Sequence, residues 1–419
     1  MIKSHTNIDK NAPTNIGWLV TITVILFYAY EYFLRVEPSP MIDYFIAHYS
    51  VNLAGIGTID AAYYWTYIPM QILVGTIVDQ FGVRKPLFLA VISCVIGSVF
   101  FGVENNFTSV IIGRMLIGFG SAFGFVAVLK TATVWLPKRH FTLAVGAATS
   151  LGMLGAILSL TTITYLIQNL GVKTTIDVSV ISGLILLIII YFIVHDRIKL
   201  NRSHHFSKRI KNIRKAFFSV IRNPQIWLVG FIGLALYLPT LLFGGLWGIP
   251  YFIHIKHYSP ETASFLSSLL FWGWIIGAPI TGYIAEYMIN DNRLLLMISS
   301  TVCTVLLTLM IYGGIGDLYT YAALIFFLGI FSSFQIVVFK VATALCPRSC
   351  SGTAVAVVNM FVMFGGPLQR WIGSLIESQK EGAAVFTEAG FQQAFLIMPV
   401  LCLLAFFVTF FLKDSKNHK

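Results

Sequence analysis

Charged side chains inside long apolar runs are the residues of this sequence most able to carry chemistry. A central Arg, Lys or Asp costs roughly 2.5–3.5 kcal/mol on membrane-insertion scales, so each needs a partner, a wet cavity or a route to the surface. Glu31 and Arg35 lie four residues apart, which places them on one helix face. The pair predicts a site where Arg35 binds an anion and Glu31 takes a proton, with Tyr32 as a substrate contact. The alternative is an interfacial ion pair that reaches out to the lipid headgroups.

Two lysines occupy matching places in the two halves of the chain. Lys130 and Lys340 each precede a proline, Pro137 and Pro347, by seven residues. Seven residues of helix span roughly 10 Å, which is deep enough to line the inner half of a cavity. Two facing ammonium groups would suit a substrate with a carboxylate, so we expect substrate-binding or gating roles. The alternative is that both lysines anchor their spans at the membrane surface.

Other polar residues in apolar runs are weaker candidates. Asp60 is a second candidate proton site. Gln335 and Asn359 are expected to face the centre and contact substrate, unless they hydrogen-bond between helices instead. Cys346 and Cys350 are close together but have no neighbouring His. The sequence therefore predicts no metal site and no cofactor.

The composition indicates the kind of element that must position these residues. Of 419 residues, 57% are apolar and only 11% are charged, and the mean hydropathy is +0.82, whereas soluble domains carry about 25% charged residues. About 20 apolar residues span the bilayer core. An all-α integral membrane protein is therefore expected. Its twelve predicted transmembrane helices lie at about 16–36, 55–79, 86–103, 107–136, 140–168, 176–195, 225–253, 261–288, 293–313, 317–345, 351–377 and 390–412.

The net charge of +11 follows the predicted topology. With the N-terminus inside, the inside segments hold 20 of the 28 Lys and Arg residues, and the outside loops hold only Lys173, Lys256 and Lys380. This asymmetry is the positive-inside rule, so both termini are expected to be cytoplasmic. The basic excess is thereby explained without a nucleic-acid partner, and none is predicted.

The chain divides into two similar halves. A basic stretch with nine Lys and Arg separates six runs from six, as expected for a linker between two pseudo-symmetric six-helix bundles. An offset of 207 residues pairs Trp65 with Trp272, Gly75 with Gly282, and Asp79 with Glu286, and an offset of 210 pairs Lys130 with Lys340. The expected parts are a tail at 1–15, a bundle at 16–195, the linker at 196–222, a bundle at 223–412 and a tail at 413–419.

A polar hairpin between the second and third runs carries the most specific motif. It reads Gly75-x3-Asp79-x2-Gly82-Val-Arg84-Lys85. It resembles the loop signature G-x3-D-x2-G-R-K/R of the major facilitator superfamily, with Val83 at the first basic position. The resemblance implies a conformational latch formed by Gly75, Asp79, Gly82, Arg84 and Lys85. Glu286 and Arg293 would remain from its degenerate copy.

Two further motifs extend the resemblance over the chain. Arg114-x3-Gly118-x-Gly120 is similar to the superfamily's fourth-helix motif, which implies proton coupling or gating by Arg114. The stretch from Gly245 to Tyr251 resembles the end of the seventh helix in organic-anion members, the anion:cation symporter branch.

Two departures from related patterns bear on coupling and direction. That branch carries Tyr-x-Asp-Arg in the first helix, and this chain keeps Tyr32 and Arg35 but has Leu34 in place of the Asp. Glu31 or Glu37 would then take the proton. The fifth run lacks the Gly-Pro of drug/proton antiporters, which favours uptake over drug export.

The prediction is a secondary active transporter that works by alternating access. The expected activity is uptake of a small organic anion or amino-acid-like carboxylate, coupled to H⁺ or alternatively to Na⁺. A proton-driven efflux antiporter and a transport-derived sensor are the alternatives. An enzyme is not expected, because the sequence has no nucleophile–base set or phosphate loop. We expect a monomer in the plasma membrane, such as a bacterial inner membrane, with several passes through the lipid bilayer.

Overall fold

A computed structural model describes residues 14–102, 106–196, 215, 217–289, 291–314, 317–347, 350–379 and 386–413. Within these ranges the regular elements are all helices. Most of the expected tails at 1–15 and 413–419, and most of the expected linker at 196–222, lie outside the described residues.

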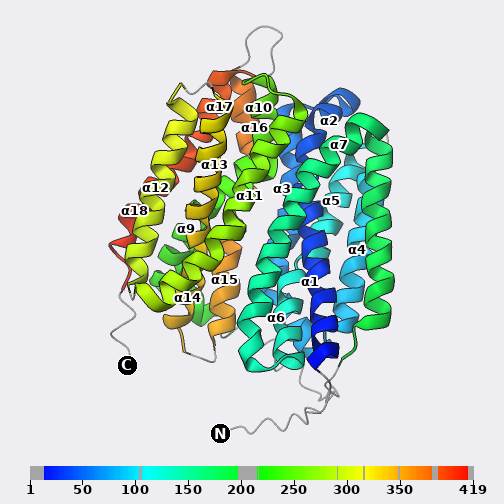
Figure 1. Ribbon diagram of the computed structural model, residues 1–419, viewed down its shortest axis with the longest axis vertical. Coiled ribbons are helices and arrows are strands. Elements are labelled where there is room, and N and C mark those ends of the chain that lie inside the picture. Colours follow the sequence, from blue (N-terminus) through cyan, green and yellow to red (C-terminus); the bar gives the residue numbers. More distant parts are fainter. Residues whose placement is uncertain are drawn as a thin grey trace.

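The first half of the chain, called the N-half, contains helices α1 to α7 (Figure 1). Their bounds are α1 Thr14–Val36, the short 3₁₀ helix η1 Ser39–Met41, α2 Ile42–Tyr49, α3 Leu53–Phe81, α4 Arg84–Phe101, α5 Phe107–Ser121, α6 Gly124–Trp135 and α7 Lys138–Ile193. Gly171, with φ 80°, interrupts α7 and divides it into two passes.

The second half, called the C-half, contains α9 to α18 and lies beside the N-half (Figure 1). Its bounds are α9 Pro224–Pro239, η2 Thr240–Trp247, α10 Gly248–His254, α11 Pro260–Tyr283, η3 Ile284–Met288, α12 Asn292–Tyr312, α13 Leu318–Ser332, η4 Ser333–Ile336, α14 Val337–Ala344, α15 Ser351–Met363, α16 Gln369–Ser378, α17 Glu388–Phe395 and α18 Ile397–Thr409.

The helices of the described residues combine into twelve passes, six in each half. Nine helical stretches of the described residues are long and apolar enough to cross a membrane. The longest of them, Arg139–Ile193, supplies two passes because of the break at Gly171. Helix α3 and the α15–α16 pair supply the remaining two. The predicted twelve-helix fold is therefore confirmed.

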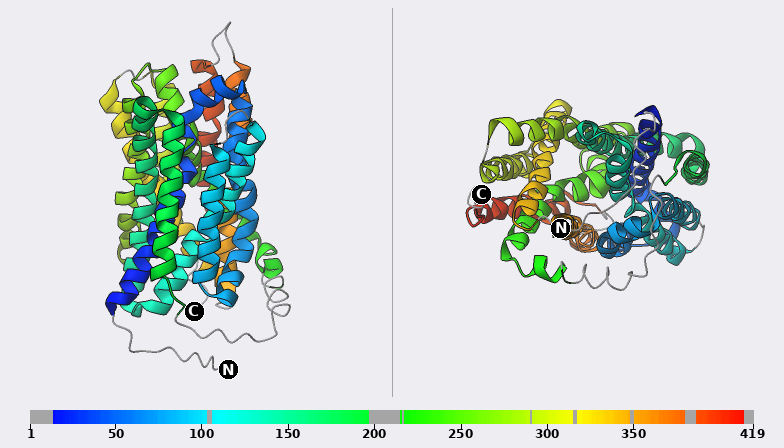
Figure 2. Two further views of the ribbon diagram at one scale, coloured as in Figure 1. Left: turned by 90° about the vertical axis from the view of Figure 1, so that its right-hand side faces the viewer. Right: turned by 90° about the horizontal axis from the view of Figure 1, so that it is seen from below.

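The passes run roughly parallel, so the molecule has two ends (Figures 1 and 2). Helix α1 begins and α18 ends on the same side, which we call the terminal side. Helices α2, α10 and α17 lie on the other side, which we call the opposite side. The linker and tails aside, this arrangement positions every candidate residue named above.

Polar caps begin many of the passes. Asn52, Asn106, Asn223, Asp291 and Asp317 each accept a hydrogen bond from a backbone N–H in the first turn of the helix that follows. A side-chain oxygen there satisfies a donor that has no partner within the helix. These short polar residues therefore mark where apolar helices start.

The seventh pass changes its helical winding near its middle. Pro239 lies at the end of α9, and the following residues Thr240–Trp247 form the π-helix η2. Proline lacks a backbone N–H and crowds the preceding turn, so it disturbs the regular hydrogen-bond ladder. The π-turn places Trp247 fully inside the protein, where its indole N–H donates to Gln369 Oε1 at 2.7 Å.

The two halves meet tightly on the opposite side. The Ser39 hydroxyl of η1 donates to the Leu246 carbonyl of η2 at 2.7 Å, and His254 Nε2 lies 2.9 Å from Asp43 Oδ1. Helix α3 also packs directly on α16, because a Cβ at Gly57 would meet the backbone of Gln369. The structure is therefore closed on this side.

The close approach of α3 to α16 generates a prediction. Gly57→Ala should hold the opposite side open, because the added methyl group overlaps the backbone of α16 when the halves close. A Ser39→Cys reporter, buried here, should then react faster with a hydrophilic maleimide. Gly146→Ala is the matched control, since a Cβ at Gly146 meets nothing within 4 Å. Equal labelling in both variants would contradict the prediction.

Candidate substrate and ion-coupling site

Arg35 and Glu31 form the first of two buried ion pairs. Arg35 Nη2 donates to both carboxylate oxygens of Glu31 at 3.0 Å, and the two side chains are 3% and 0% exposed. The Tyr63 hydroxyl completes a triangle: it accepts from Arg35 Nε and donates to Glu31 Oε2, each at 3.1 Å. The pair is fully buried, so it is not an interfacial pair that reaches the headgroups.

Tyrosines surround the guanidinium of Arg35. Its Cζ lies 4.1 Å from the ring centre of Tyr32, 5.2 Å from that of Tyr67 and 5.5 Å from that of Tyr63. Such contacts stabilise a cation through the negative face of the ring. One donor, Arg35 Nη1, is buried and has no hydrogen-bond partner within the described part of the chain. A buried donor that lacks a partner is costly, so this nitrogen is available to an acceptor that the protein does not supply.

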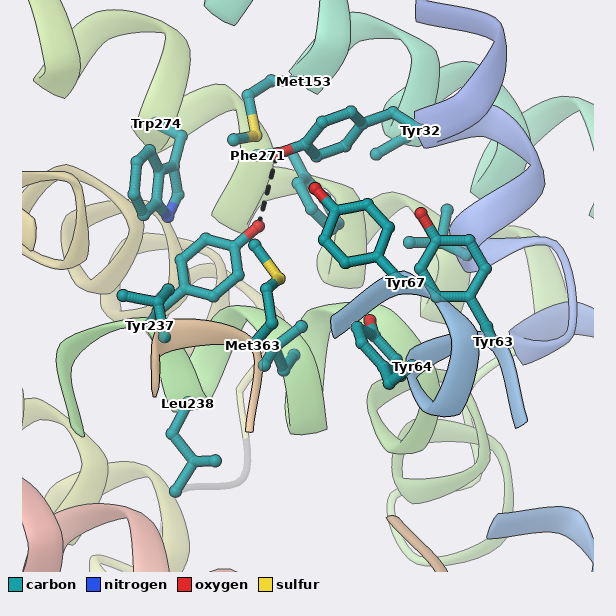
Figure 3. Packing of buried hydrophobic residues seen from close by; sticks show 14 of the residues in the cluster. Tyr32, Tyr63, Tyr64, Tyr67, Met153, Tyr237, Leu238, Phe271, Trp274 and Met363 are labelled. Atoms are coloured by element: carbon teal, nitrogen blue, oxygen red, sulfur yellow. Dashed lines mark hydrogen bonds between the residues drawn. The ribbon is translucent and has the colours of Figure 1, made fainter. Parts of the chain in front are cut away.

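The arginine site lies where the two halves meet. The hydroxyls of Tyr32 on α1 and Tyr237 on α9 point toward one another at 3.4 Å (Figure 3). Tyr237 packs edge-on against Trp274, whose indole N–H donates to Thr240 Oγ1 at 2.9 Å. A solute held by Arg35 would therefore be close to side chains of both halves, as alternating access requires.

Arg114 and Asp60 form the second buried pair. Arg114 Nη2 lies 3.1 Å from Asp60 Oδ1, and both side chains are almost completely buried. The same guanidinium donates to the carbonyls of Leu34 at 2.7 Å and Arg35 at 3.0 Å. These carbonyls are at the end of α1, where a helix presents acceptors without partners and a negative dipole. Arg114 therefore holds the residues of the first pair in place.

The structure places Lys130 and Lys340 on the terminal side, away from Arg35. Lys130 Nζ lies 2.5 Å from Asp79 Oδ1. Asp79 is twelve residues beyond Tyr67 on α3, which is about 18 Å of helix. Lys340 Nζ donates to the Ala285 carbonyl, next to Glu286. The two lysines thus contact matching places in the two halves, but they do not join the buried arginine site.

The motif hairpin between α3 and α4 is held from within the N-half. Gly82 has φ 80°, a conformation that favours glycine, and a Cβ there would meet the Asp196 carboxylate. Asp196 Oδ1 accepts from the backbone N–H groups of Val83 at 2.7 Å and Arg84 at 3.2 Å. Arg84 also donates to the Tyr191 carbonyl at 2.9 Å, whereas Lys85 is exposed.

The remaining candidates are dispersed. Gly75 has open space around it, and Glu286 is exposed in η3. Arg293 lies 3.4 Å from Asp291. Gln335 is buried in η4 with its Nε2 lacking a partner, and Asn359 is half-buried on α15.

Sequence reasoning missed several residues of the site. The sequence favours packing or interfacial roles for Tyr63 and Tyr67, and it gives no role to Tyr237 or Gln369. Tyr63 and Tyr67 are four residues apart, so they share a helix face, and that spacing was a usable signal. Among the described residues, no group of three or more His, Cys, Asp or Glu could hold a metal ion.

Comparison with known proteins supplies the decisive observation on identity. Residues 18–369 match the family model described as Major Facilitator Superfamily. The chain belongs to this superfamily. It is therefore a multi-pass membrane protein of a family of transporters rather than of enzymes.

Individual relatives are distant. The chain is 24% identical over 312 residues to the lysosomal dipeptide transporter MFSD1 of Danio rerio, covering 69% of this chain and 66% of that protein. It is 24% identical over 328 residues to the D-galactonate transporter of Escherichia coli, covering 71% and 73%. A third relative is a nitrate/nitrite transporter of Picosynechococcus, which is 26% identical over 111 residues, or 21% of its length. The match thus covers less than two thirds of the length of several relatives.

Two solved structures share the fold. A bacterial homologue of the human lysosomal transporter Spinster, in an inward-facing and occupied conformation, gives a TM-score of 0.73 at 14% identity and covers 94% of this chain and 96% of its own. The D-xylose-proton symporter gives a TM-score of 0.73 at 13% identity and covers 95% and 98%. At these identities the likeness concerns the fold alone.

The Arg114–Asp60 pair generates a second prediction. Removing one partner of a buried ion pair leaves an uncompensated charge and costs about 3–5 kcal/mol. Arg114→Met should therefore lower the thermal unfolding temperature in detergent, and the double variant Arg114→Met/Asp60→Asn should recover part of the loss. Arg370→Met is the control, because Arg370 is exposed. Equal unfolding temperatures for Arg114→Met and Arg370→Met would show that the Arg114–Asp60 pair is not needed for stability.

Proposed function

We propose that this transporter takes up a small organic anion together with a proton. The observation that carries the proposal is the buried Arg35, which keeps one donor without a partner at the interface between the halves. A carboxylate or similar oxyanion would satisfy this nitrogen with a charge-assisted hydrogen bond. The tyrosine hydroxyls around it would accept from or donate to the polar groups of the solute.

The names of relatives support an anionic solute. Among proteins similar to this chain are transporters named for D-galactonate, sulfoacetate and nitrate or nitrite. Each of these solutes is an anion. A dipeptide, the solute in the name of the Danio rerio relative, also carries a carboxylate. All of these solutes therefore require a positively charged group inside a dry binding site.

The proposed orientation places the terminal side in the cytoplasm. The Lys and Arg residues on that side include Lys130, Arg84, Lys85, Arg293 and Lys340, whereas Lys256 lies on the opposite side. This distribution agrees with the positive-inside rule. With this orientation the structure is closed toward the outside. An inward-moving proton would supply about 2.3 kcal/mol per 100 mV of membrane potential.

A transport assay tests the proposal. The purified protein would be reconstituted in liposomes and offered D-galactonate, sulfoacetate, nitrate or a dipeptide, with and without an inward proton gradient. We expect at least one of these anions to accumulate only when the gradient is present. Accumulation driven by a Na⁺ gradient alone would show that Na⁺ rather than H⁺ is the coupling ion. Expulsion of the solute driven by the proton gradient would show efflux rather than uptake.

Arg35 should be indispensable for binding. A hydrogen bond to a charged group contributes about 1.5–3 kcal/mol, so Arg35→Gln should weaken binding of the transported anion roughly 10- to 150-fold. Ligand-induced thermal shift measures this change. Arg370→Gln, at an exposed arginine, is the control. Retained affinity in Arg35→Gln would remove the proposed role of this residue.

Asp79 and the two lysines are proposed to gate the terminal side. Asp79 pairs with Lys130 here, and it would move to the positive N-terminus of a helix in the C-half when that side closes. Asp79→Asn should therefore slow transport more than it weakens solute binding. Uptake rate and thermal shift are measured on the same preparation. Unchanged uptake at normal membrane expression would argue against the latch.

A further inference from the structure

Glu37 is a buried carboxylic acid that takes part in neither of the two buried ion pairs. It follows the end of α1 directly and is 0% exposed. Its Oε1 accepts from the Ser179 hydroxyl of α7 at 2.5 Å, and its Oε2 has no hydrogen-bond partner among the residues that the structure describes. The Tyr30 hydroxyl donates to the Ser179 carbonyl at 3.0 Å, which fixes the same part of α7.

The charges around the end of α1 do not balance. In the described ranges the buried cations are Arg35 and Arg114, and each already has a carboxylate partner, Glu31 and Asp60 respectively. Glu37 is a third buried carboxylate and has only a hydroxyl group as partner. An isolated ionised carboxylate in a dry interior is very costly, and such a group neutralises instead. A single bound proton on Glu37 would make the cluster neutral overall.

The groups that face Glu37 come from three helices. Arg114 on α5 acts on it through charge, but its guanidinium is occupied by Asp60 and two carbonyls. Tyr30 on α1 is its other titratable neighbour. Ser179 on α7 is the hydroxyl donor. Arg114 therefore offsets only part of the cost of an ionised Glu37.

Glu37 also lies next to the contact that closes the opposite side. Pro38 follows it, and the next residue is Ser39, whose hydroxyl bonds to the Leu246 carbonyl of the C-half. Opening the opposite side must break this bond and bring water to the end of α1. Closing it returns Glu37 to a site without water. The position of this carboxylate in the chain thus links its hydration to the movement of the two halves.

We propose that Glu37 is a proton-carrying residue of the transport cycle and that the opposite side closes only when its carboxylate is neutral. The proton comes from water on the opposite side while that side is open. It joins a carboxylate oxygen of Glu37, and the neutral acid can then be buried beside Ser179. This inference deepens the proposed proton coupling and rests on it, but it can be tested without a known substrate.

The test measures how closure of the opposite side depends on pH. Spin labels would be attached at Ala47→Cys on α2 and Ser378→Cys on α16, both exposed on the opposite side, after replacement of the half-buried Cys346 and Cys350 by Ser. Pulsed electron resonance then gives the distance between the labels in liposomes. We expect the short distance, the closed form, to gain population as pH falls.

Glu37→Gln should abolish this response. The amide mimics the neutral acid, so the short distance should dominate at every pH. The His254–Asp43 contact also joins the halves on the opposite side, so Asp43→Asn is the matched control and should keep the pH response. A pH response in Glu37→Gln equal to that of the wild type would overturn the inference. So would its loss in Asp43→Asn, or its absence in the wild type.

The same preparations separate this inference from the proposed function. If no anion accumulates with a proton gradient but the distance still responds to pH through Glu37, the proposed function fails and the inference stands. If an anion accumulates and Glu37→Gln accumulates it equally well, the inference fails and the proposed function stands.

Discussion

The cost of charge in a dry interior is the constraint on which this structure depends. Two arginines reach the end of α1, and neither can be buried alone. Arg114 binds the last carbonyls of that helix and Asp60, and Arg35 binds Glu31. Tyr63 hydrogen-bonds to the Arg35–Glu31 pair and presents its ring 5.2 Å from Arg114 Cζ. The end of α1, the start of α3 and the middle of α5 are thereby fixed together.

The two halves share a pattern of helices but divide the chemistry unequally. The buried ion pairs described here belong to the N-half. The C-half contributes neutral groups at the interface, such as Tyr237, Trp274 and the Trp247–Gln369 hydrogen bond. The lysines show the same divergence, because Lys130 meets a carboxylate and Lys340 a backbone carbonyl. Repetition fixes where a side chain lies, and the partner that each half supplies decides what it does.

The sequence predicted what depends on local spacing. The twelve passes follow from the length of apolar runs, and the Glu31–Arg35 pair follows from a separation of four residues on one helix. It could not predict contacts that depend on how helices pack. Lys130 and Asp79 are separated by 51 residues, and Tyr32 and Tyr237 by 205. Lys130 was therefore expected in the cavity, and Tyr63 and Tyr67 were expected to be packing residues, whereas Tyr32 was predicted as a substrate contact.

The same constraint connects solute and proton in the proposed cycle. An anion at Arg35 Nη1 would add negative charge beside Glu31, and like charges at short range favour the neutral form of a carboxyl group. Proton uptake in this cluster and anion binding would therefore strengthen each other, and by linkage each does so to the same extent. Closing the opposite side removes water from the cluster, which makes any unbalanced charge more costly. With Glu37 neutral, a bound anion and one further proton leave the cluster neutral, so the two enter the closed form together more readily than either does alone, and that preference is the physical basis of coupling.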